Sequence, residues 1–146
     1  MDNTDIKIIN ILQENCKAST REIGKEVGLT APAVAERINR LKDAGVIEGF
    51  HAKINETLLG NNISAYIMVN VPPRDYAAFC RFCEENPSIS EHHHIVGLNN
   101  VLIRIRTENS HTLDMLLESL RKFGLSNTSV LLSSYFEHKE FPLKED

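Results

Sequence analysis

Apolar residues recur at helical spacing at the start of the chain. Ile6, Ile9 and Leu12 form one stripe, which predicts a first helix from Asp2 to Gln13. The acidic residues near its start suit the positive end of the helix dipole. We therefore expect this helix to be the surface on which the next elements pack.

Two shorter helices with clear boundary signals follow. Ser19 and Glu22 have the spacing of a capping box, which predicts a helix start, and Gly28 can end that helix because it accepts a positive φ. Thr30, with Pro32 in the next turn, predicts a second start. Two capped helices around a tight turn form a helix-turn-helix, whose second helix enters the major groove of DNA.

The second of these helices is amphipathic. Its apolar side runs from Val34 to Gly45, so the opposite side and its flank face solvent. Arg37 and Arg40 there suit guanine edges and phosphates, although both could merely solvate the helix and pair with Glu36 or Asp43. The capped turn favours the DNA interpretation. The residues that we expect to contact DNA are Thr30, Pro32, Glu36, Arg37, Asn39 and Arg40.

The segment after the helix-turn-helix has a different pattern. Val46 to Ile54 alternates enough to predict two short strands, a small wing. Asn55 to Asn62 is polar and contains Gly60, which is typical of a linker. We therefore expect a DNA-binding domain over residues 1–60 and a second domain over residues 61–146.

In the second domain, strand and helix patterns alternate in the order β-α-β-β-α-β. Strands are predicted at Ile63–Val71, Ile89–Val96, Val101–Thr107 and Thr128–Phe136, and helices at Asp75–Glu85 and Ser110–Phe123. This order predicts a ferredoxin-like sandwich with both helices on one sheet face, so the whole chain is of the α+β class. Tyr66, Met68, Ile103 and Ile105 would lie on the uncovered face. An exposed apolar face indicates a protein interface, so we expect a homodimer.

Composition qualifies the DNA interpretation. The 146 residues are 42% hydrophobic, enough for packed cores, but the formal net charge is −4. DNA affinity would have to come from a local basic cluster, doubled by dimerisation. This cluster comprises Lys17, Arg21, Lys25, Arg37, Arg40 and Lys42.

Targeting signals are not visible in the sequence. No apolar run approaches the roughly 20 residues that cross a bilayer. The first residues are acidic and lack the basic start of a signal peptide. We therefore expect a cytoplasmic protein without a membrane partner.

The chain offers few residues for other chemistry. Cys80-x-x-Cys83 could suggest a redox or zinc site, but it falls on the apolar face of a predicted helix, so two buried thiols are favoured. His92 and His94 share a strand face and could ligate zinc, although a structural role is favoured. No nucleophilic triad or phosphate-binding glycine loop is visible. We expect no catalytic residues, no metal and no cofactor.

The whole chain resembles the Lrp/AsnC, or feast/famine, family of transcription regulators. The C-terminal half resembles the family through Glu91-His92-His93, Gly97 and the strand from Val101. The resemblance implies homodimers, often assembled into octamers, that bind and bend double-stranded operator DNA and respond to an amino acid or related metabolite. The N-terminal motifs that carry it are Asp2-x-x-Asp5-x-x-Ile8-Ile9-x-x-Leu12, Ser19-x-x-Glu22-Ile23-Gly24, Val27-Gly28-Leu29-Thr30, Val34-x-x-Arg37-Ile38-x-x-Leu41 and Gly45-Val46-Ile47.

One turn departs from the family pattern. Members that sense amino acids commonly carry Gly-x-[Tyr/Phe]-Asp there, whereas this chain has Gly97, Leu98, Asn99 and Asn100. The resemblance implies that these residues bind the effector, with amides where a carboxylate would meet the ligand's ammonium group. Alternatively, the two asparagines simply form a tight hairpin.

Two other functions remain open from the sequence. The chain could be a DNA-architectural protein without an effector. Some enzymes that decarboxylate haem precursors share this two-part architecture, and the fold alone does not exclude catalysis. The recognition helix favours a regulator that is not an enzyme.

Overall fold

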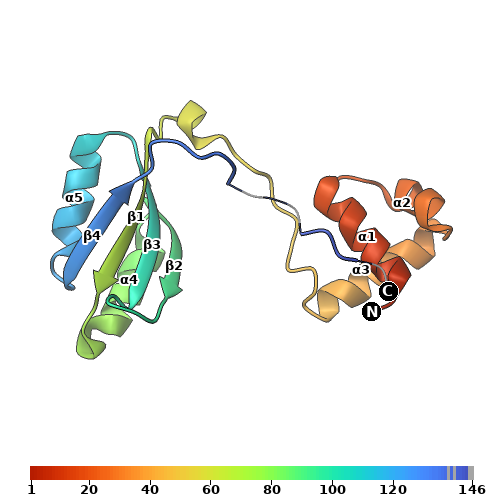
Figure 1. Ribbon diagram of the computed structural model, residues 1–146, viewed down its shortest axis with the longest axis horizontal. Helices are drawn as coiled ribbons and strands as arrows, with labels where there is room; N and C mark the ends of the chain where they lie inside the picture. The colour runs from red at the N-terminus through yellow and green to blue at the C-terminus, as the bar shows by residue number, and fades with distance from the viewer. Residues whose placement is uncertain (138, 140, 145–146) are drawn as a thin grey trace. The chain divides into compact units, whose positions relative to one another are not determined.

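The chain folds into two compact units. The computed structural model describes residues 1–137, 139 and 141–144. Unit 1 comprises Met1–Lys53 together with Phe136–Asp146, and unit 2 comprises Ile54–Tyr135 (Figure 1). The boundary thus falls between Lys53 and Ile54, and the end of the chain groups with its beginning.

Unit 1 contains the helices that the sequence predicts, and each starts at a side-chain cap. Helix α1 is Asn3–Glu14, one residue later than predicted, and Asp2 caps it in a reciprocal box with Asp5. Helix α2 is Thr20–Val27, where Ser19 and Glu22 form the predicted capping box. Gly28 ends α2 at φ +72°, a conformation that glycine adopts without steric cost.

Helix α3 is Ala31–Asp43 and carries the predicted polar face. Thr30 caps it by accepting a hydrogen bond from Ala33 N, and Pro32 lies in its first turn. Its apolar side packs against α1 and α2, because Val34 belongs to the same buried cluster as Ile8 and Ile23. The three helices therefore form the predicted helix-turn-helix.

The predicted wing was wrong. Residues 46–54 lie wholly within the described chain and form no strand there. The backbone N–H groups of Val46 and Ile47 both donate to Leu41 O, at 2.9 and 3.2 Å, and so close the end of α3. Short alternating segments become strands only when another strand pairs with them, which the sequence pattern does not specify.

Unit 2 contains an antiparallel sheet in the order β2-β3-β1-β4, as a ferredoxin-like fold requires (Figure 1). The short helices η1 (Glu56–Leu59) and η2 (Pro73–Asp75) precede β1 and α4 respectively. The larger elements are β1 (Ile63–Asn70), α4 (Tyr76–Glu85), β2 (Ile89–His94), β3 (Val101–Thr107), α5 (Ser110–Leu120) and β4 (Leu125–Val130).

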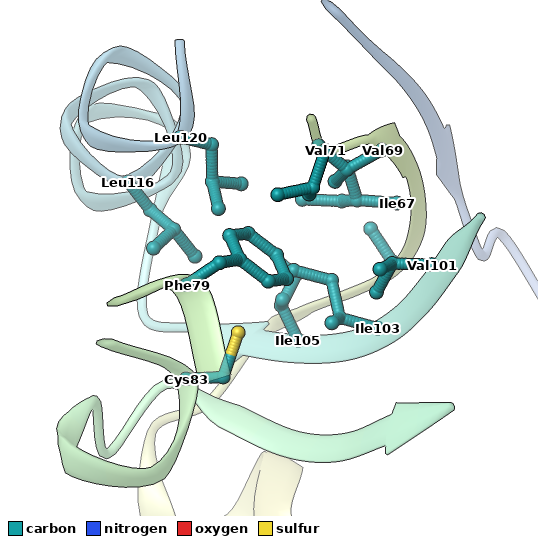
Figure 2. Packing of buried hydrophobic residues seen from close by; sticks show 11 residues of the cluster. Ile67, Val69, Val71, Phe79, Cys83, Val101, Ile103, Ile105, Leu116 and Leu120 are labelled. Atoms are coloured by element: carbon teal, nitrogen blue, oxygen red, sulfur yellow. The ribbon is translucent and has the colours of Figure 1, made fainter. Parts of the chain in front are cut away.

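Both helices of unit 2 cover the same face of the sheet. Phe79 of α4 and Leu120 of α5 join Ile67 of β1 and Ile103 of β3 in one buried cluster. Figure 2 shows the ring of Phe79 in the middle of this cluster. The opposite face of the sheet has no helix over it within the described part of unit 2.

The prediction that Ile103 and Ile105 lie on the uncovered face was wrong. Both side chains are fully buried under the helices. Since β1 and β3 pair with Ile67 opposite Ile103 and Tyr66 opposite Arg104, alternate residues of the two strands share a face. Tyr66 and Met68 do lie on the uncovered face, and their partners there are Arg104 and Leu102.

Two element ends near the C-terminus also differ from the prediction. Helix α5 ends at Leu120, not Phe123, because Phe123 N already donates to Leu120 O in a tighter turn. Strand β4 therefore begins at Leu125 and ends at Val130, whereas Thr128–Phe136 was predicted. A Cβ atom at Gly124 would lie 2.1 Å from Asn70 O, so only glycine lets the chain turn this close to β1.

Candidate nucleic-acid interface and effector turn

Helix α3 presents its polar side to solvent and is fixed from the opposite side. Val34 and Leu41 are buried, and Val34 packs with Ile8 of α1 and Ile23 of α2. The turn before it is tight, since a Cβ atom at Gly24 would lie 2.5 Å from Leu29 O. Among the predicted DNA-contacting residues, those that the structure leaves exposed are Thr30, Pro32, Glu36, Asn39 and Arg40.

Arg37 differs from these residues because its guanidinium binds two acids at the start of α1, the capping residue Asp2 and Asp5. Arg37 Nη1 donates to Asp2 Oδ2 and Asp5 Oδ1, both at 2.7 Å. The Arg37 side chain is 25% exposed and that of Asp5 is 2% exposed. The alternative that the arginines pair with Glu36 or Asp43 is corrected: in the structure Arg37 binds Asp2 and Asp5, and Arg40 binds Asp5, at the start of α1.

Arg40 shares the same acid more loosely. Its Nη2 donates to Asp5 Oδ1 and Oδ2, both at 3.2 Å, and its side chain is 62% exposed. Arg37 is thus held by short bonds at the edge of the core, whereas Arg40 remains largely in solvent. The two arginines have the same charge but different accessibility to a ligand.

The ionisation of this cluster is fixed by its contacts. Burial pushes the pKa of Asp5 up, but hydrogen bonds from Arg37 and from the backbone of Asp2 outweigh it, so the pKa is lowered. The bond from Arg37 also lowers the pKa of Asp2, and the two acids together raise the pKa of Arg37. All three groups are therefore charged at neutral pH.

The turn between β2 and β3 is braced by one of its two asparagines. Asn100 Oδ1 accepts from Val71 N at 2.9 Å, and Asn100 Nδ2 donates to Val71 O at 2.7 Å. Its amide is therefore occupied by the end of β1 and does not point freely at an effector. Asn99 is half-buried and Leu98 is 97% exposed, so the rest of the predicted site is open to contact.

Comparison with known proteins agrees with this arrangement. The AsnC-type helix-turn-helix domain matches residues 1–42, and the Lrp/AsnC ligand-binding domain matches residues 64–141. The HTH-type transcriptional regulator YezC of Bacillus subtilis is 35% identical over 141 residues, covering 97% of this chain and 100% of that protein. The chain belongs to the Lrp/AsnC family. It is therefore a DNA-binding transcriptional regulator of that type.

Two further proteins bear on the comparison. The regulator FL11 of Pyrococcus furiosus is 35% identical over 147 residues, covering 99% of this chain and 97% of that protein. The structure of regulator NMB0573 of Neisseria meningitidis, solved in complex with L-Met, has a TM-score of 0.89 at 21% identity. It covers 97% of this chain and 96% of that chain, and this likeness shows the shared fold.

Two cysteines and one histidine of this Lrp/AsnC chain, Cys80, Cys83 and His92, lie close together in unit 2. Burial, followed by the nearby Cys80, raises the pKa of Cys83 to about 12, so this thiol stays protonated. Cys80 Sγ lies 4.0 Å from His92 Nε2, and the His92 ring packs against Phe79 and Tyr76. Among the residues that the structure describes, no group of three potential ligands could hold a metal ion.

Two features of the DNA-binding unit escaped the sequence interpretation. One is the buried carboxylate of Asp5, although a signal for it exists: Asp5 precedes Ile8, Ile9 and Leu12 at the spacing of the apolar stripe. It could have been recognised as an acid on the inner face of α1 that needs a cationic partner.

The other is the return of the chain end to α1. The Asn10 side chain exchanges two 3.0 Å hydrogen bonds with the backbone of Leu143, and Gln13 does the same with Phe141. These hydrogen bonds involve the backbone of the chain end, so a pattern of side chains in the sequence does not predict them.

In the described portion of the chain, no helix is long and apolar enough to traverse a bilayer.

Proposed function

We propose that this Lrp/AsnC regulator binds duplex DNA as a homodimer, with the outer face of α3 in the major groove. The observation that carries the proposal is the capped helix-turn-helix, in which α1 and α2 hold the apolar side of α3 and leave its outer side exposed at Thr30, Glu36, Asn39 and Arg40. A homodimer would place two such helices on successive half-sites. The basic residues Lys17, Arg21, Lys25 and Lys42 are also exposed and would meet phosphates.

The uncovered sheet face of unit 2 supports the dimer. Tyr66, Met68 and Leu102 are only partly buried there, and no helix packs over them within the described residues. Arg104 lies 5.7 Å from the centre of the Tyr66 ring and binds Glu91 at 3.1 Å, so the charges on this face are compensated. A partly apolar face with paired charges suits a contact with a second copy. Further assembly to an octamer follows the family resemblance.

We also propose that a small metabolite, such as an amino acid, binds at the turn of Gly97, Leu98 and Asn99. The L-Met complex of NMB0573 supports an amino-acid ligand for a protein of the same fold. Asn100 acts in this proposal as the brace that shapes the turn, since its amide is bonded to Val71. That occupied amide also favours a second candidate, a DNA-binding protein of this family without an effector.

A charge placed on the outer face of α3 tests the DNA proposal. Asn39 is exposed, so Asn39→Asp should leave the fold intact while repelling the phosphates. Lys122→Ala changes the net charge equally on an exposed residue of unit 2 and serves as the control. Both variants are assayed by gel shift on a duplex that the wild-type protein selects from a random-sequence library.

The expected result is at least a tenfold loss of affinity, about 1.4 kcal/mol, for Asn39→Asp and little change for Lys122→Ala. Equal DNA affinities of the two variants would show that α3 does not contact the DNA.

The relatives are named transcriptional regulators, so we do not propose catalysis. We propose that the protein acts in the compartment that holds the chromosome.

A further inference from the structure

The two arginines of α3 meet the first turn of α1 at a single buried carboxylate. Asp5 accepts from Arg37, from Arg40 and from the backbone N–H of Asp2. A carboxylate this deeply buried needs partners in every state of the protein, because an unpaired buried charge is strongly unfavourable. The hydrogen-bond donors that Asp5 keeps when DNA binds therefore decide which arginine can exchange Asp5 for the DNA.

The geometry points to different roles for the two arginines. We propose that Asp5 is a positioning residue for DNA binding: through Arg37 it fixes α3 on α1, and it releases Arg40 to a DNA phosphate. The inference rests on the proposed function, because it assumes that α3 faces DNA.

Arg37 is suited to the fixed role. One of its nitrogens reaches both Asp2 and Asp5 at 2.7 Å, so it joins the middle of α3 to the first turn of α1. The contact is short and three-quarters shielded from solvent. Withdrawing Arg37 would expose two acids to each other and leave Asp5 with only weaker partners, so DNA is a poor competitor for it.

Arg40 is suited to the mobile role. Its contacts with Asp5 are longer, at 3.2 Å, and its side chain is mostly in solvent. Because the Arg40 side chain is already largely in solvent and Asp5 keeps other hydrogen-bond donors, exchanging the carboxylate for a phosphate costs little. Arg40 also lies on the exposed side of α3 with Glu36 and Asn39, where a DNA backbone would pass.

The carboxylate of Asp5 remains satisfied after Arg40 leaves. Its Oδ1 still accepts from Arg37 at 2.7 Å, and its Oδ2 still accepts from Asp2 N at 3.1 Å. Both oxygens therefore keep a partner, and α3 does not have to shift. Of these two arginines, Arg40 is consequently the one that can change partners while the buried carboxylate of Asp5 stays hydrogen-bonded.

Binding measured against salt separates the two roles. The full-length protein is titrated with the selected duplex at several salt concentrations, at a temperature where circular dichroism shows each variant to be folded. Arg40→Ala should weaken binding and reduce the salt slope by about one unit, as expected for one lost phosphate contact. Arg121→Ala, which removes an exposed arginine from unit 2, is the matched control and should change neither.

Asp5→Asn tests the positioning role. Because no phosphate contact is lost, the affinity per folded molecule should fall several-fold at an unchanged salt slope. Arg37→Lys keeps a charge beside Asp5 and should fold, and it should likewise weaken binding without changing the slope. A merely structural carboxylate would lower the melting temperature and leave the affinity of the folded protein unchanged, which would overturn the proposal.

Two further outcomes would also contradict it. If Arg37→Lys reduced the salt slope, Arg37 would contact a DNA phosphate. If Arg40→Ala left the salt slope unchanged, Arg40 would not contact a DNA phosphate. The Asn39→Asp variant keeps this test separate from the proposed function. If Asn39→Asp weakens binding while the Asp5 and Arg40 variants do not, this inference alone fails; if none of them does, α3 does not face the DNA.

Discussion

At the scale of single residues, side chains of one type have different roles according to their depth. Arg37 and Arg40 lie three residues apart, yet one is three-quarters shielded by α1 and the other is largely exposed. Asn99 and Asn100 are neighbours, yet of the two it is Asn100 whose side chain bonds the backbone of Val71, the residue that follows β1. Charged and polar residues in the sequence therefore predict which side of an element forms a surface. The burial of each side chain in the structure decides whether a ligand can reach it.

The stability of unit 1 should depend on pH through the acids that bind Arg37. The pKa values of Asp2 and Asp5 are both lowered by folding, so their stabilising effect is present above the unfolded value near 3.8 and is lost as pH falls through the folded values. Melting temperatures measured by circular dichroism from neutral pH to about pH 3 should fall less steeply for Asp5→Asn than for the wild type. Glu26→Gln removes an exposed carboxylate of α2 as the control. Identical acid profiles for the wild type and Asp5→Asn would contradict the shifted pKa of Asp5.

At the scale of elements, close approaches between neighbouring strands and turns shape the second unit. Gly124 lets the chain pass β1 because a Cβ atom there would collide with Asn70 O. The amide of Asn100 then joins the turn before β3 to the residue that follows β1, Val71. The β2–β3 turn is thus held by its neighbour as well as by its own hairpin bond from Ile95 N to Asn100 O.

Replacing Asn100 by aspartate should loosen this turn, although aspartate is the residue that the family pattern has there. Asp offers no donor to Val71 O and brings a negative charge beside it, so we expect Asn100→Asp to lose about 1–3 kcal/mol of unfolding free energy. Asn99→Asp makes the same chemical change next to it, where no such bond is lost, and is the matched control. Urea denaturation compares the two. Equal stability would mean that the Val71 bonds do not hold the turn.

At the scale of the whole molecule, the two units divide the tasks of the regulator. Unit 1 carries α3, which we propose to face DNA, and unit 2 carries the uncovered sheet face and the turn that we propose to bind an effector. The chain end groups with unit 1, so the segment after β4 also links the two units in sequence.

A charge on the uncovered sheet face should separate the proposed dimer. Met68→Glu places a carboxylate where a second copy would pack, and an unpaired buried charge at an interface costs several kcal/mol. Met115→Glu makes the same change on an exposed residue of α5 and is the control. Sedimentation velocity should show a smaller species for Met68→Glu only. Ile103→Glu should instead unfold the unit, because Ile103 lies in its core. An unchanged sedimentation coefficient in a folded Met68→Glu protein would place the dimer contact elsewhere.

The sequence by itself determined the features that depend on residues close together in the chain. The Ser19–Glu22 capping box, the glycine that ends α2, the polar side of α3 and the order of strands and helices in unit 2 all follow from spacings of a few residues. Tertiary structure decided what depends on distant partners. Strand register placed Ile103 and Ile105 in the core, the lack of a partner strand left residues 46–54 without a wing, and packing of α1 on α3 joined Asp5 to Arg37. The physical reason is that local signals fix where an element begins and which side is apolar, whereas a buried charge or a strand edge finds its partner only once the elements have packed.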